Sequence, residues 1–395
     1  MPLPGESSAL AYVGEHLAHL ASAPHTASAI RGGQVAADAA LAGFDVTGYA
    51  RKRNEVAPRE RRGASMLSPY IRHGLLRLND VWADVADGPP RDVAKFRDEL
   101  MWQEYARHWY SELGSATRVG VRRELATVHD GVVWDRSMRC LDSVLGELED
   151  DGWLVNQTRM WLASHWAVRS NGRWQTGEDM FFRHLLDGSR AANRLGWQWT
   201  TGVGSSKPYG FSRWQVNKRA PGMCDTCEHR TACPIEDWPV DPNYESTEPG
   251  ARPPISSEAA AGPSSTDWFG EPTTVWLTAE SLGAGDPALA AHPELPVVFV
   301  FDEPLLRRLQ LCTKRLVFLV ETLAEIADSR SLQLWLGSPR SVIADRRVAV
   351  TYAPVPGFRR IIDDVDVACI HPWPWLRRPT GGSVASFSAW RKGLR

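Results

Sequence analysis

The chain has no apolar run long enough to cross a lipid bilayer. Its first residues also lack the basic start and apolar core of a secretory signal. A net charge of −2 over 395 residues gives no overall attraction to nucleic acid, so any DNA binding must use a local basic face. We therefore expect a cytoplasmic protein that acts without a membrane, and a monomer, since nothing in the sequence calls for a second copy.

Cysteine is scarce, with six residues, and no Gly-x-Gly-x-x-Gly sequence is present. In a cytosolic chain, six cysteines argue for thiols or metal ligands rather than for a disulfide framework. The missing glycine pattern argues against a dinucleotide-binding Rossmann domain. No internal repeat is found.

Tryptophan, by contrast, is abundant, and ten of the eighteen lie between Trp102 and Trp214. A buried indole N–H needs a partner, which makes tryptophan a costly residue for simple core filling. This concentration favours a stacked cofactor, a base-stacking surface or an electron path. The alternative is a tryptophan-rich helical core.

The pattern of apolar residues divides the chain into four parts. Residues 1–30 are an Ala- and Ser-rich N-terminal extension, and residues 31–238 have helical periodicity. Residues 239–272, rich in Pro, Ser, Glu and Gly, predict a flexible linker. Residues 273–395 alternate strand and helix patterns, which predicts a small parallel-sheet α/β domain behind an all-helical one. The expected strands are at 274–277, 296–301 and 332–336, with a helix at 315–327.

Two polar segments of the helical region suit ligand binding. Ser65 and Ser68 stand just before a predicted helix, where hydroxyls and free N–H groups can hold a phosphate. Further on, Asn156, Arg159 and Met160 share one helical face through their spacing of three and four residues.

A third segment, Asp187–Trp199, places a carboxylate, an amide and two indoles within thirteen residues. With it, the chain contains Leu-Ser-Pro-Tyr, Glu-Leu-x-Trp, Gly-Trp-x-x-Asn-x-x-Arg-Met, Asp-Gly-x-x-x-x-Asn and Gly-Trp-Gln-Trp. In this order and spacing, the motifs resemble those of the photolyase/cryptochrome family over roughly residues 49–209. In that family FAD lies folded within a helical domain, so the resemblance implies an FAD cofactor.

The resemblance assigns roles to single residues around this FAD. Arg159 and Asp187 would form an ion pair beside the isoalloxazine, and Asn193 would face flavin N5. Ser189 stands where the family has a second carboxylate that contacts the flavin ring, which leaves the stability of reduced flavin open. The alternative is an ordinary buried salt bridge with a helix-capping serine. The FAD phosphates would be lined by Tyr49, Ser65, Met66, Leu67 and Ser68.

The cysteines Cys224, Cys227 and Cys233 form a compact array followed by a proline. Three thiolates at this spacing suit a metal or iron–sulfur site. The chain resembles the bacterial iron–sulfur branch of the family, in which a cysteine at the position of Cys140 completes the set. We therefore expect a [4Fe–4S] cluster, and the alternative is structural zinc with His229 as a further ligand. Cys312 and Cys369 are interpreted as ordinary core thiols.

The resemblance also implies a substrate, UV-damaged DNA. In cyclobutane-dimer photolyases, the residues matching Glu99 and Trp102 hydrogen-bond and stack on the dimer, and Asn156, Met160 and Trp199 would complete that pocket. A flipped-out dimer needs such a combination of an aromatic wall and a polar contact. The alternative takes Trp102 as core and Glu99 as a surface charge. Trp197 and Trp174 match the inner members of the family's photoreduction chain, whose outer member would be Trp134, Trp166 or the cluster.

The expected function is thus light-driven splitting of pyrimidine dimers by electron transfer from reduced FAD, with a phosphate-binding face of Arg122, Arg123, Arg213, Lys218 and Arg219. A scatter of surface cations is the alternative for that face. Ser189 and Gln103, together with the missing outer tryptophan, favour the alternative of a cryptochrome-like photoreceptor or redox flavoprotein without repair activity. A light-independent flavoenzyme is a third hypothesis.

In the family the α/β antenna domain comes first, whereas here the similar pattern comes last. We interpret the chain as a circular permutation, bridged by residues 239–272. The segment Phe387–Lys392 would correspond to the exit linker of the antenna domain. An unrelated α/β domain is the alternative, and the identity of any antenna chromophore is open.

Overall fold

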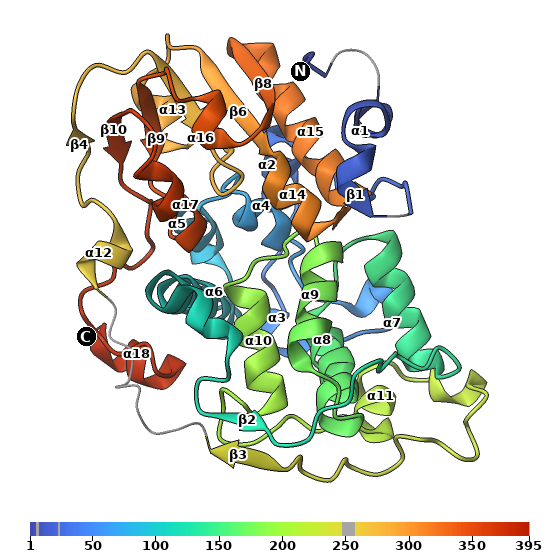
Figure 1. Cartoon of the computed structure of the whole chain (residues 1–395). Coiled ribbons are helices and arrows are strands. Elements are labelled where there is room, and N and C mark those ends of the chain that lie inside the picture. Colours follow the sequence, from blue (N-terminus) through green and yellow to red (C-terminus); the bar gives the residue numbers. More distant parts are fainter. Residues whose placement is uncertain (5–7, 23, 247–256, 395) are drawn as a thin grey trace.

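The computed structural model describes residues 1–4, 8–22, 24–246 and 257–394. A helical part and an α/β part lie against each other (Figure 1). This division follows the sequence, because the middle of the chain has helical periodicity and the last third has buried strand runs. The helical part contains α2 (Gln34–Ala42), α3 (Tyr49–Lys52), α4 (Ser68–Arg72), α5 (Leu78–Asp84), α6 (Pro90–Leu113), α7 (Arg139–Asp150), α8 (Asn156–Ala163), α9 (Trp174–His184), α10 (Ala192–Thr201) and α11 (Arg213–Arg219).

The long helix α6 is the centre of the helical part. It begins with a proline in its first turn and ends at Gly114, whose φ of 53° a residue with a side chain rarely adopts. Its buried face includes Phe96 and Trp109. The Asp92 carboxylate in its first turn accepts hydrogen bonds from the backbone N–H groups of Gly48 and Ala50, which fixes the start of α3 against α6. Helices α8, α9 and α10 pack on one another beside it.

The α/β part contains one six-stranded sheet in the order β4-β10-β9-β5-β6-β8. All neighbours are parallel except β4, which runs antiparallel to β10. The strand order reverses between β5 and β9, and open α/β sheets bind ligands at the carboxyl ends of the strands at such a point. The strands are β4 (Asp267–Trp268), β5 (Thr274–Leu277), β6 (Val297–Asp302), β8 (Leu332–Gly337), β9 (Val348–Thr351) and β10 (Val367–His371).

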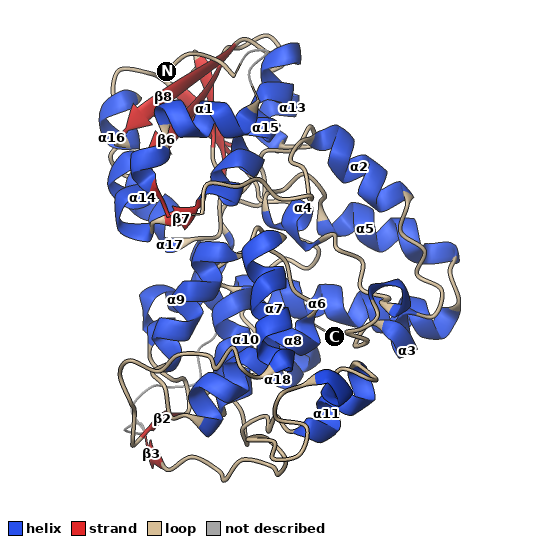
Figure 2. Cartoon of the chain, turned by 90° about the vertical axis from the view of Figure 1, so that its right-hand side faces the viewer, coloured by secondary structure: helices blue, strands red, loops and turns tan. Residues whose placement is uncertain are grey.

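Helices cover both faces of this sheet (Figure 2). The strands of its centre are buried on both sides, as expected for parallel strands between helices. The largest of these helices, α15, is buried over most of its length. The helices of this part are α13 (Pro287–Ala291), α14 (Glu303–Leu309), α15 (Thr313–Ser329), α16 (Pro339–Val342) and α17 (Pro356–Ile362).

The N-terminal segment, expected as an extension, instead completes the α/β part. Helix α1 (Ala9–His16) packs on α15, and β1 (Ala21–Ser22) pairs with β7 (Leu311–Cys312). Tyr12 and Val13 belong to the same apolar core as the sheet. The segment is held because these apolar side chains cover one side of α15.

The chain crosses back to the helical part at its C-terminus. Helix α18 (Phe387–Gly393), at the segment interpreted as a domain-exit linker, packs on α6. The Trp390 indole donates to His108 Nδ1 over 2.8 Å. Of the predicted linker 239–272, residues 247–256 lie outside the described residues. On either side, β3 (Tyr244–Ser246) pairs with β2 (Arg123–Leu125), and α12 (Glu258–Ala261) contacts α6.

Polar contacts of partly or fully buried side chains join the two parts. Arg72 of α4 forms an ion pair with Glu280, which follows β5, over 2.6 Å. Arg315 of α15 donates to the backbone carbonyls of Phe182 and Gly188 in the helical part. The cost of removing these charged groups from water is offset only when the two parts are in contact. The contacts therefore favour this one arrangement of the two parts.

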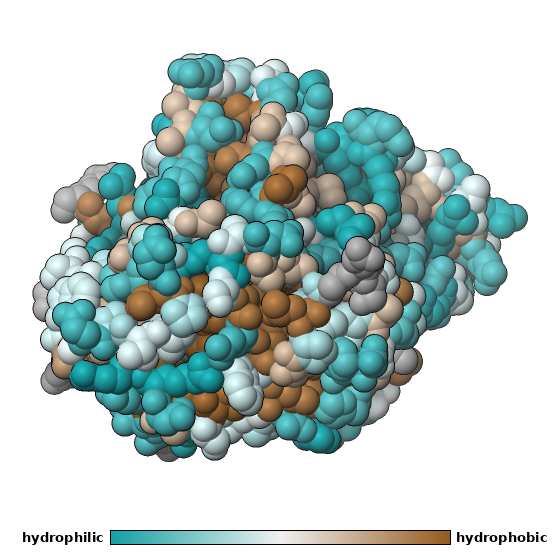
Figure 3. All heavy atoms as spheres, turned by 90° about the horizontal axis from the view of Figure 1, so that it is seen from above, coloured by the Kyte–Doolittle hydropathy of each residue, from teal (hydrophilic) through white to brown (hydrophobic). Residues whose placement is uncertain are grey.

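On the surface seen from above, apolar side chains gather near the middle and hydrophilic ones surround them (Figure 3). Within the described ranges, no helix combines the length and apolarity required to cross a membrane.

Candidate functional site

A cavity of about 1280 Å³ lies between the helical part and the carboxyl edge of the sheet. It exceeds the roughly 300–1,000 Å³ typical of small-molecule sites. Helices α3, α4, α6, α8, α9 and α10 supply one wall, and residues at the ends of β5, β6 and β9 supply the other. The cavity therefore has room for an extended ligand reaching from the helices towards the sheet.

The cavity is strongly basic. Among the described residues that line it, eleven are arginines and four are aspartates or glutamates. In a site shielded from water, such an excess attracts anions, and planar guanidinium groups suit phosphate oxygens. The arrangement therefore favours a ligand that carries phosphate. The arginines are Arg53, Arg72, Arg107, Arg118, Arg159, Arg190, Arg194, Arg308, Arg315, Arg359 and Arg360.

The ion pair expected from the sequence is present. Arg159 Nη2 lies 2.8 Å from Asp187 Oδ2, and Arg159 Nε donates to the Leu154 carbonyl over 3.0 Å. The other carboxylate oxygen of Asp187 is buried and has no hydrogen-bond partner among the described residues. A buried acceptor of this kind is costly unless a ligand donates to it, so Asp187 has one oxygen available for the cavity.

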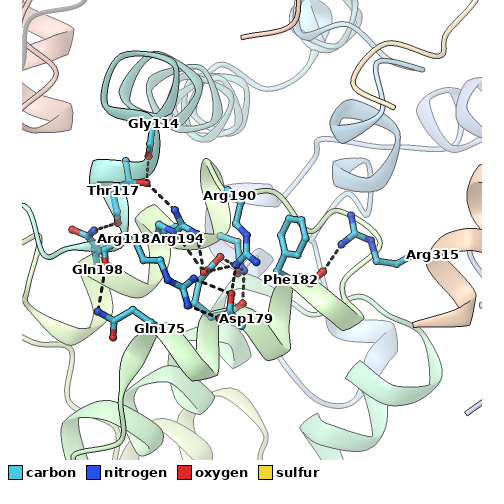
Figure 4. A network of polar contacts seen from close by, with 12 residues as sticks. Gly114, Thr117, Arg118, Gln175, Asp179, Phe182, Arg190, Arg194, Gln198 and Arg315 are labelled. Atoms are coloured by element: carbon cyan, nitrogen blue, oxygen red, sulfur yellow. Dashed lines mark hydrogen bonds and ion pairs between the residues drawn. The ribbon is translucent and has the colours of Figure 1, made fainter. Parts of the chain in front are cut away.

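A second network of charged groups surrounds Asn193. Its side-chain amide donates to the backbone carbonyl of Glu178 over 3.3 Å, and Arg190 and Arg194 both pair with the Glu178 carboxylate. Burial raises the pKa of Glu178, and the two arginines act against this shift. Arg118 and Arg190 also converge on Asp179 (Figure 4). The network holds the amide of Asn193 at the cavity wall.

The predicted phosphate-side residues lie at the same cavity, with one exception. Tyr49, Ser65, Met66 and Ser68 line it. Ser68 Oγ accepts a hydrogen bond from the Trp153 indole, which keeps Ser68 in place. The Leu67 side chain is instead wholly buried. It packs in the apolar core formed by α2–α6.

The tryptophans predicted for electron transfer belong to one apolar core. Trp197 lines the cavity, whereas Trp174 is buried in that core. Neither indole N–H has a partner among the described residues. The Phe181 ring lies 5.1 Å from that of Trp197 and 6.2 Å from that of Trp134. Trp134 contacts Trp166 in turn, with ring centroids 4.6 Å apart.

A Gly177→Ala substitution is expected to displace Trp197. A Cβ atom at Gly177 would lie 2.2 Å from Trp197 Cη2, closer than any real contact. Overpacking of this kind costs about 1–3 kcal/mol, so the melting temperature should fall. Gly146→Ala is the matched control, because a Cβ there meets nothing within 4 Å and should stabilise α7 slightly. Equal melting temperatures for the two variants would contradict the packing of Trp197 on α9.

The comparisons with known proteins concern this helical region. Residues 96–220 match the family model described as the FAD binding domain of DNA photolyase. The matched range contains most of α6 and all of α7 to α11, and therefore the ion pair, Asn193 and Trp197. This part of the chain is therefore similar to the FAD binding domain of DNA photolyases.

The curated relatives are proteins named deoxyribodipyrimidine photo-lyase. That of Salmonella typhimurium is 32% identical over 157 residues, 36% of this chain and 32% of the relative. That of Thermus thermophilus is 30% identical over 187 residues, 44% of each chain. That of Vibrio cholerae is 27% identical over 38% of this chain and 35% of its own. The chain thus spans less than half of the length of these photolyases.

Two solved structures align with about half of the chain, at low TM-scores. The Synechocystis cryptochrome has a TM-score of 0.42 at 18% identity, over 51% of this chain and 46% of the other. A bacterial class III photolyase from Agrobacterium tumefaciens has a TM-score of 0.39 at 23% identity, over 55% of this chain and 46% of the other.

The residues that the photolyase resemblance assigns to a dimer lie at the same cavity. Glu99 forms ion pairs with Lys95 over 2.9 Å and with Arg53 over 3.2 Å. Trp102 lines the cavity, but its ring stacks on Phe387 of α18 with centroids 3.9 Å apart. One face of this indole is therefore covered by the chain's own C-terminal helix. Asn156, Met160, Ser189 and Trp199 also line the cavity.

The four predicted metal-ligating cysteines come together elsewhere in the photolyase-like part. Cys140 at the start of α7 and Cys224, Cys227 and Cys233 line one small hollow of about 20 Å³. Burial, and then the other three thiols, raise the pKa of Cys140 to about 12. His229, the alternative zinc ligand, lies at the same hollow and contacts Ser137 Oγ over 2.7 Å.

Four of the five cations of the expected phosphate-binding face have contacts within the protein, and the DNA-binding role of the face stays a prediction. Arg213 and Arg219 pair with Glu236 and Glu55. The Arg123 guanidinium lies 3.7 Å from the Tyr244 ring, and Lys218 lies over Trp214. These four cations contact other groups of the protein, as several of the cavity arginines also do.

Of the cavity arginines of this photolyase-like site, the sequence analysis identified Arg159 and missed the others. Arg190 and Arg194 lie within the segment Asp187–Trp199, from which the site was predicted, so the sequence could have indicated their role. Arg308 and Arg359 come from the α/β part, and only the folded interface brings them to the helices.

Proposed function

We propose that the chain binds FAD in the cavity and uses it, in light, to split cyclobutane pyrimidine dimers in UV-damaged DNA. The observation that carries this proposal is the Arg159–Asp187 pair, with one Asp187 oxygen still unpartnered among the described residues of an arginine-rich cavity. The family model that matches residues 96–220 and the photo-lyase names of the relatives support it.

The residues of the cavity fit FAD by their chemistry. Tyr49, Ser65, Met66 and Ser68 would hold the phosphate side, with the cavity arginines neutralising its charge. Asp187, paired with Arg159, would accept from the flavin side through its second oxygen, and Asn193 would offer its amide to the ring. FAD would supply the light-driven single-electron transfer that dimer splitting requires.

The dimer would enter from the side of Glu99 and Trp102. A dimer must leave the helical stack to be reached, and it then needs an aromatic surface and a polar contact. Trp102 and Trp199 would supply the surface, Glu99 the polar contact, and Asn156 and Met160 the rim. Trp197 and Trp174 would carry electrons to the flavin, with Trp134 and Trp166 next along the path.

The experiment that tests repair is illumination of the flavin-loaded protein with an oligonucleotide that contains one cyclobutane thymine dimer. We expect the dimer to disappear in blue light and to persist in the dark. Flavin-loaded protein that leaves the dimer intact after illumination under reducing conditions would contradict the proposal.

A second candidate function is a cryptochrome-like photoreceptor without repair. The observation that favours it is the stacking of Phe387 on Trp102, which covers one face of the expected dimer platform. Ser189, in place of the family's carboxylate, and Gln103 point the same way.

Phe387→Ala is expected to separate the two functions. A stacked aromatic pair contributes about 0.5–1.5 kcal/mol beyond burial. If α18 must move away from Trp102 before the dimer can stack there, removal of this pair should tighten binding of dimer DNA up to about tenfold. Fluorescence anisotropy with damaged and undamaged oligonucleotides measures this, with Phe269→Ala, an exposed ring of the α/β part, as control. Equal, weak binding of both oligonucleotides by both variants would favour the photoreceptor.

We propose further that Cys140, Cys224, Cys227 and Cys233 hold a [4Fe–4S] cluster. Tetrahedral zinc with bonds of about 2.3 Å would bring the sulfurs to about 3.8 Å from one another. Among the described residues, no three of these four sulfurs lie within 4.8 Å of one another. The sulfurs are therefore not in the arrangement that bound zinc requires, and the metal content of the protein distinguishes the cluster from zinc.

Cys227→Ser is expected to remove this cluster. The purified variant should lose its iron and the broad visible absorption that iron–sulfur proteins show, while far-ultraviolet circular dichroism stays unchanged. Cys312→Ser is the control, because Cys312 is a buried thiol of the α/β part that donates to the His184 carbonyl. Iron absent from the unaltered protein after anaerobic purification would contradict the cluster.

We also propose that the chain is a circular permutation, with the α/β part as its antenna-like domain. The order of the parts supports this, because the sheet follows the helices in the chain. The identity of an antenna chromophore is left open.

A further inference from the structure

A cluster of two histidines and one cysteine lies in the α/β part, and none of the three lines the proposed FAD cavity or the four-cysteine hollow. Cys369 and His371 are two residues apart on β10, so their side chains leave the same face of the sheet. His292 follows α13, which packs over β9 and β10 (Figure 1). The cluster was not expected from the sequence, in which Cys369 was interpreted as a core thiol.

The three donor atoms converge on one point. The Nε2 atoms of His292 and His371 lie 3.1 Å apart, and Cys369 Sγ lies 3.5 Å from each. Around tetrahedral zinc, with bonds of about 2.0–2.1 Å to nitrogen and about 2.3 Å to sulfur, these separations would be about 3.3 and about 3.6 Å. The observed separations match without any rearrangement of the backbone.

A second layer of contacts orients the ligands. Thr266 Oγ1 lies 3.1 Å from His371 Nδ1, which leaves Nε2 to face the other two donors. Metal-ligating histidines commonly use their second nitrogen in this way. The Trp268 ring of β4 lies 5.9 Å from the His292 ring and 6.3 Å from the His371 ring, so it forms an apolar wall.

We propose that His292, Cys369 and His371 bind zinc and thereby fasten α13 to the β10 edge of the sheet. The fourth position is left for a water or for Glu271, whose carboxylate interacts electrostatically with both His292 and Cys369. Two imidazoles and a thiolate are ligands that zinc commonly takes. Strand β4 pairs antiparallel with β10 beside the site, and Thr266 just before β4 contacts His371.

The test is the zinc content of the full chain after anaerobic purification, measured by plasma mass spectrometry after equilibration with equimolar zinc chloride. We expect one zinc per chain in the unaltered protein and in Cys312→Ser, whose thiol is equally buried in the same part. Cys369→Ser and His371→Asn should bind zinc at least about 100-fold more weakly, and Thr266→Val about tenfold more weakly with an unchanged circular dichroism spectrum.

The four-cysteine hollow provides an internal check. Zinc at the proposed site should persist in Cys227→Ser, whereas zinc held by the four cysteines should be lost from that variant. Retention of zinc by His371→Asn together with its loss from Cys227→Ser would overturn the proposal. So would an unaltered protein that takes up no zinc.

Discussion

Asp187→Asn is expected to yield folded protein that purifies with little or no FAD. The substitution removes the charge that Arg159 neutralises over 2.8 Å and leaves that guanidinium without its carboxylate. It also changes the one oxygen that has no partner among the described residues. A hydrogen bond to a charged group contributes about 1.5–3 kcal/mol, which corresponds to about 10- to 100-fold in the dissociation constant of FAD. Flavin absorbance and titration with FAD measure the loss.

Asp364→Asn is the matched control for this experiment. Asp364 pairs with Arg340 over 2.9 Å, a similar distance, but both side chains are half exposed on the α/β part. Exposed pairs contribute about 0–1 kcal/mol, so this variant should keep its flavin and its stability. If Asp187→Asn bound FAD as tightly as Asp364→Asn, the ion pair would not belong to the cofactor site.

Glu99→Ala is expected to abolish light-dependent repair and to leave FAD bound. Glu99 is held by Arg53 and Lys95 at the cavity, on the side where the dimer would enter. Loss of a hydrogen bond to a charged acceptor corresponds to at least about 10- to 100-fold in the rate of repair. The measurement is dimer loss per absorbed photon at equal flavin content.

Two further variants separate a role in repair from a role in folding. Glu99→Gln keeps a hydrogen-bonding group of the same shape and should recover part of the repair activity. Asp80→Ala removes an exposed carboxylate that pairs with Arg77 outside the cavity, so its repair rate should equal that of the unaltered protein. Unchanged repair in Glu99→Ala would remove this residue from the substrate side.

Much of the fold could be predicted from local pattern. The runs at 274–277 and 332–336 coincide with β5 and most of β8, and the helix expected at 315–327 lies within α15. Each of these segments has either a continuous run of apolar residues or apolar residues that recur on one face of a helix. Strands β9 and β10 have four and five residues; β9 pairs with β5, which lies far away along the chain, and β10 pairs with β9. The N-terminal segment could not be placed for the same reason, since its apolar residues match α15 only after folding.

The candidate site was predictable where its residues are close in sequence. Asp187, Ser189 and Asn193 lie within one short segment, and the structure brings them to one cavity with Arg159. Leu67 was expected to line the cavity, but its side chain is buried in the core. Its neighbours Met66 and Ser68 line the cavity instead. The His292–Cys369–His371 cluster was hidden because β10 supplies two ligands and a distant turn the third.

The central claim is that FAD occupies the cavity between the helices and the sheet. Its most direct test is the flavin content of the purified full chain, determined from its absorption spectrum before and after incubation with FAD. The account predicts one FAD per chain, released on denaturation. A colourless, well-folded protein that takes up no added FAD would contradict it.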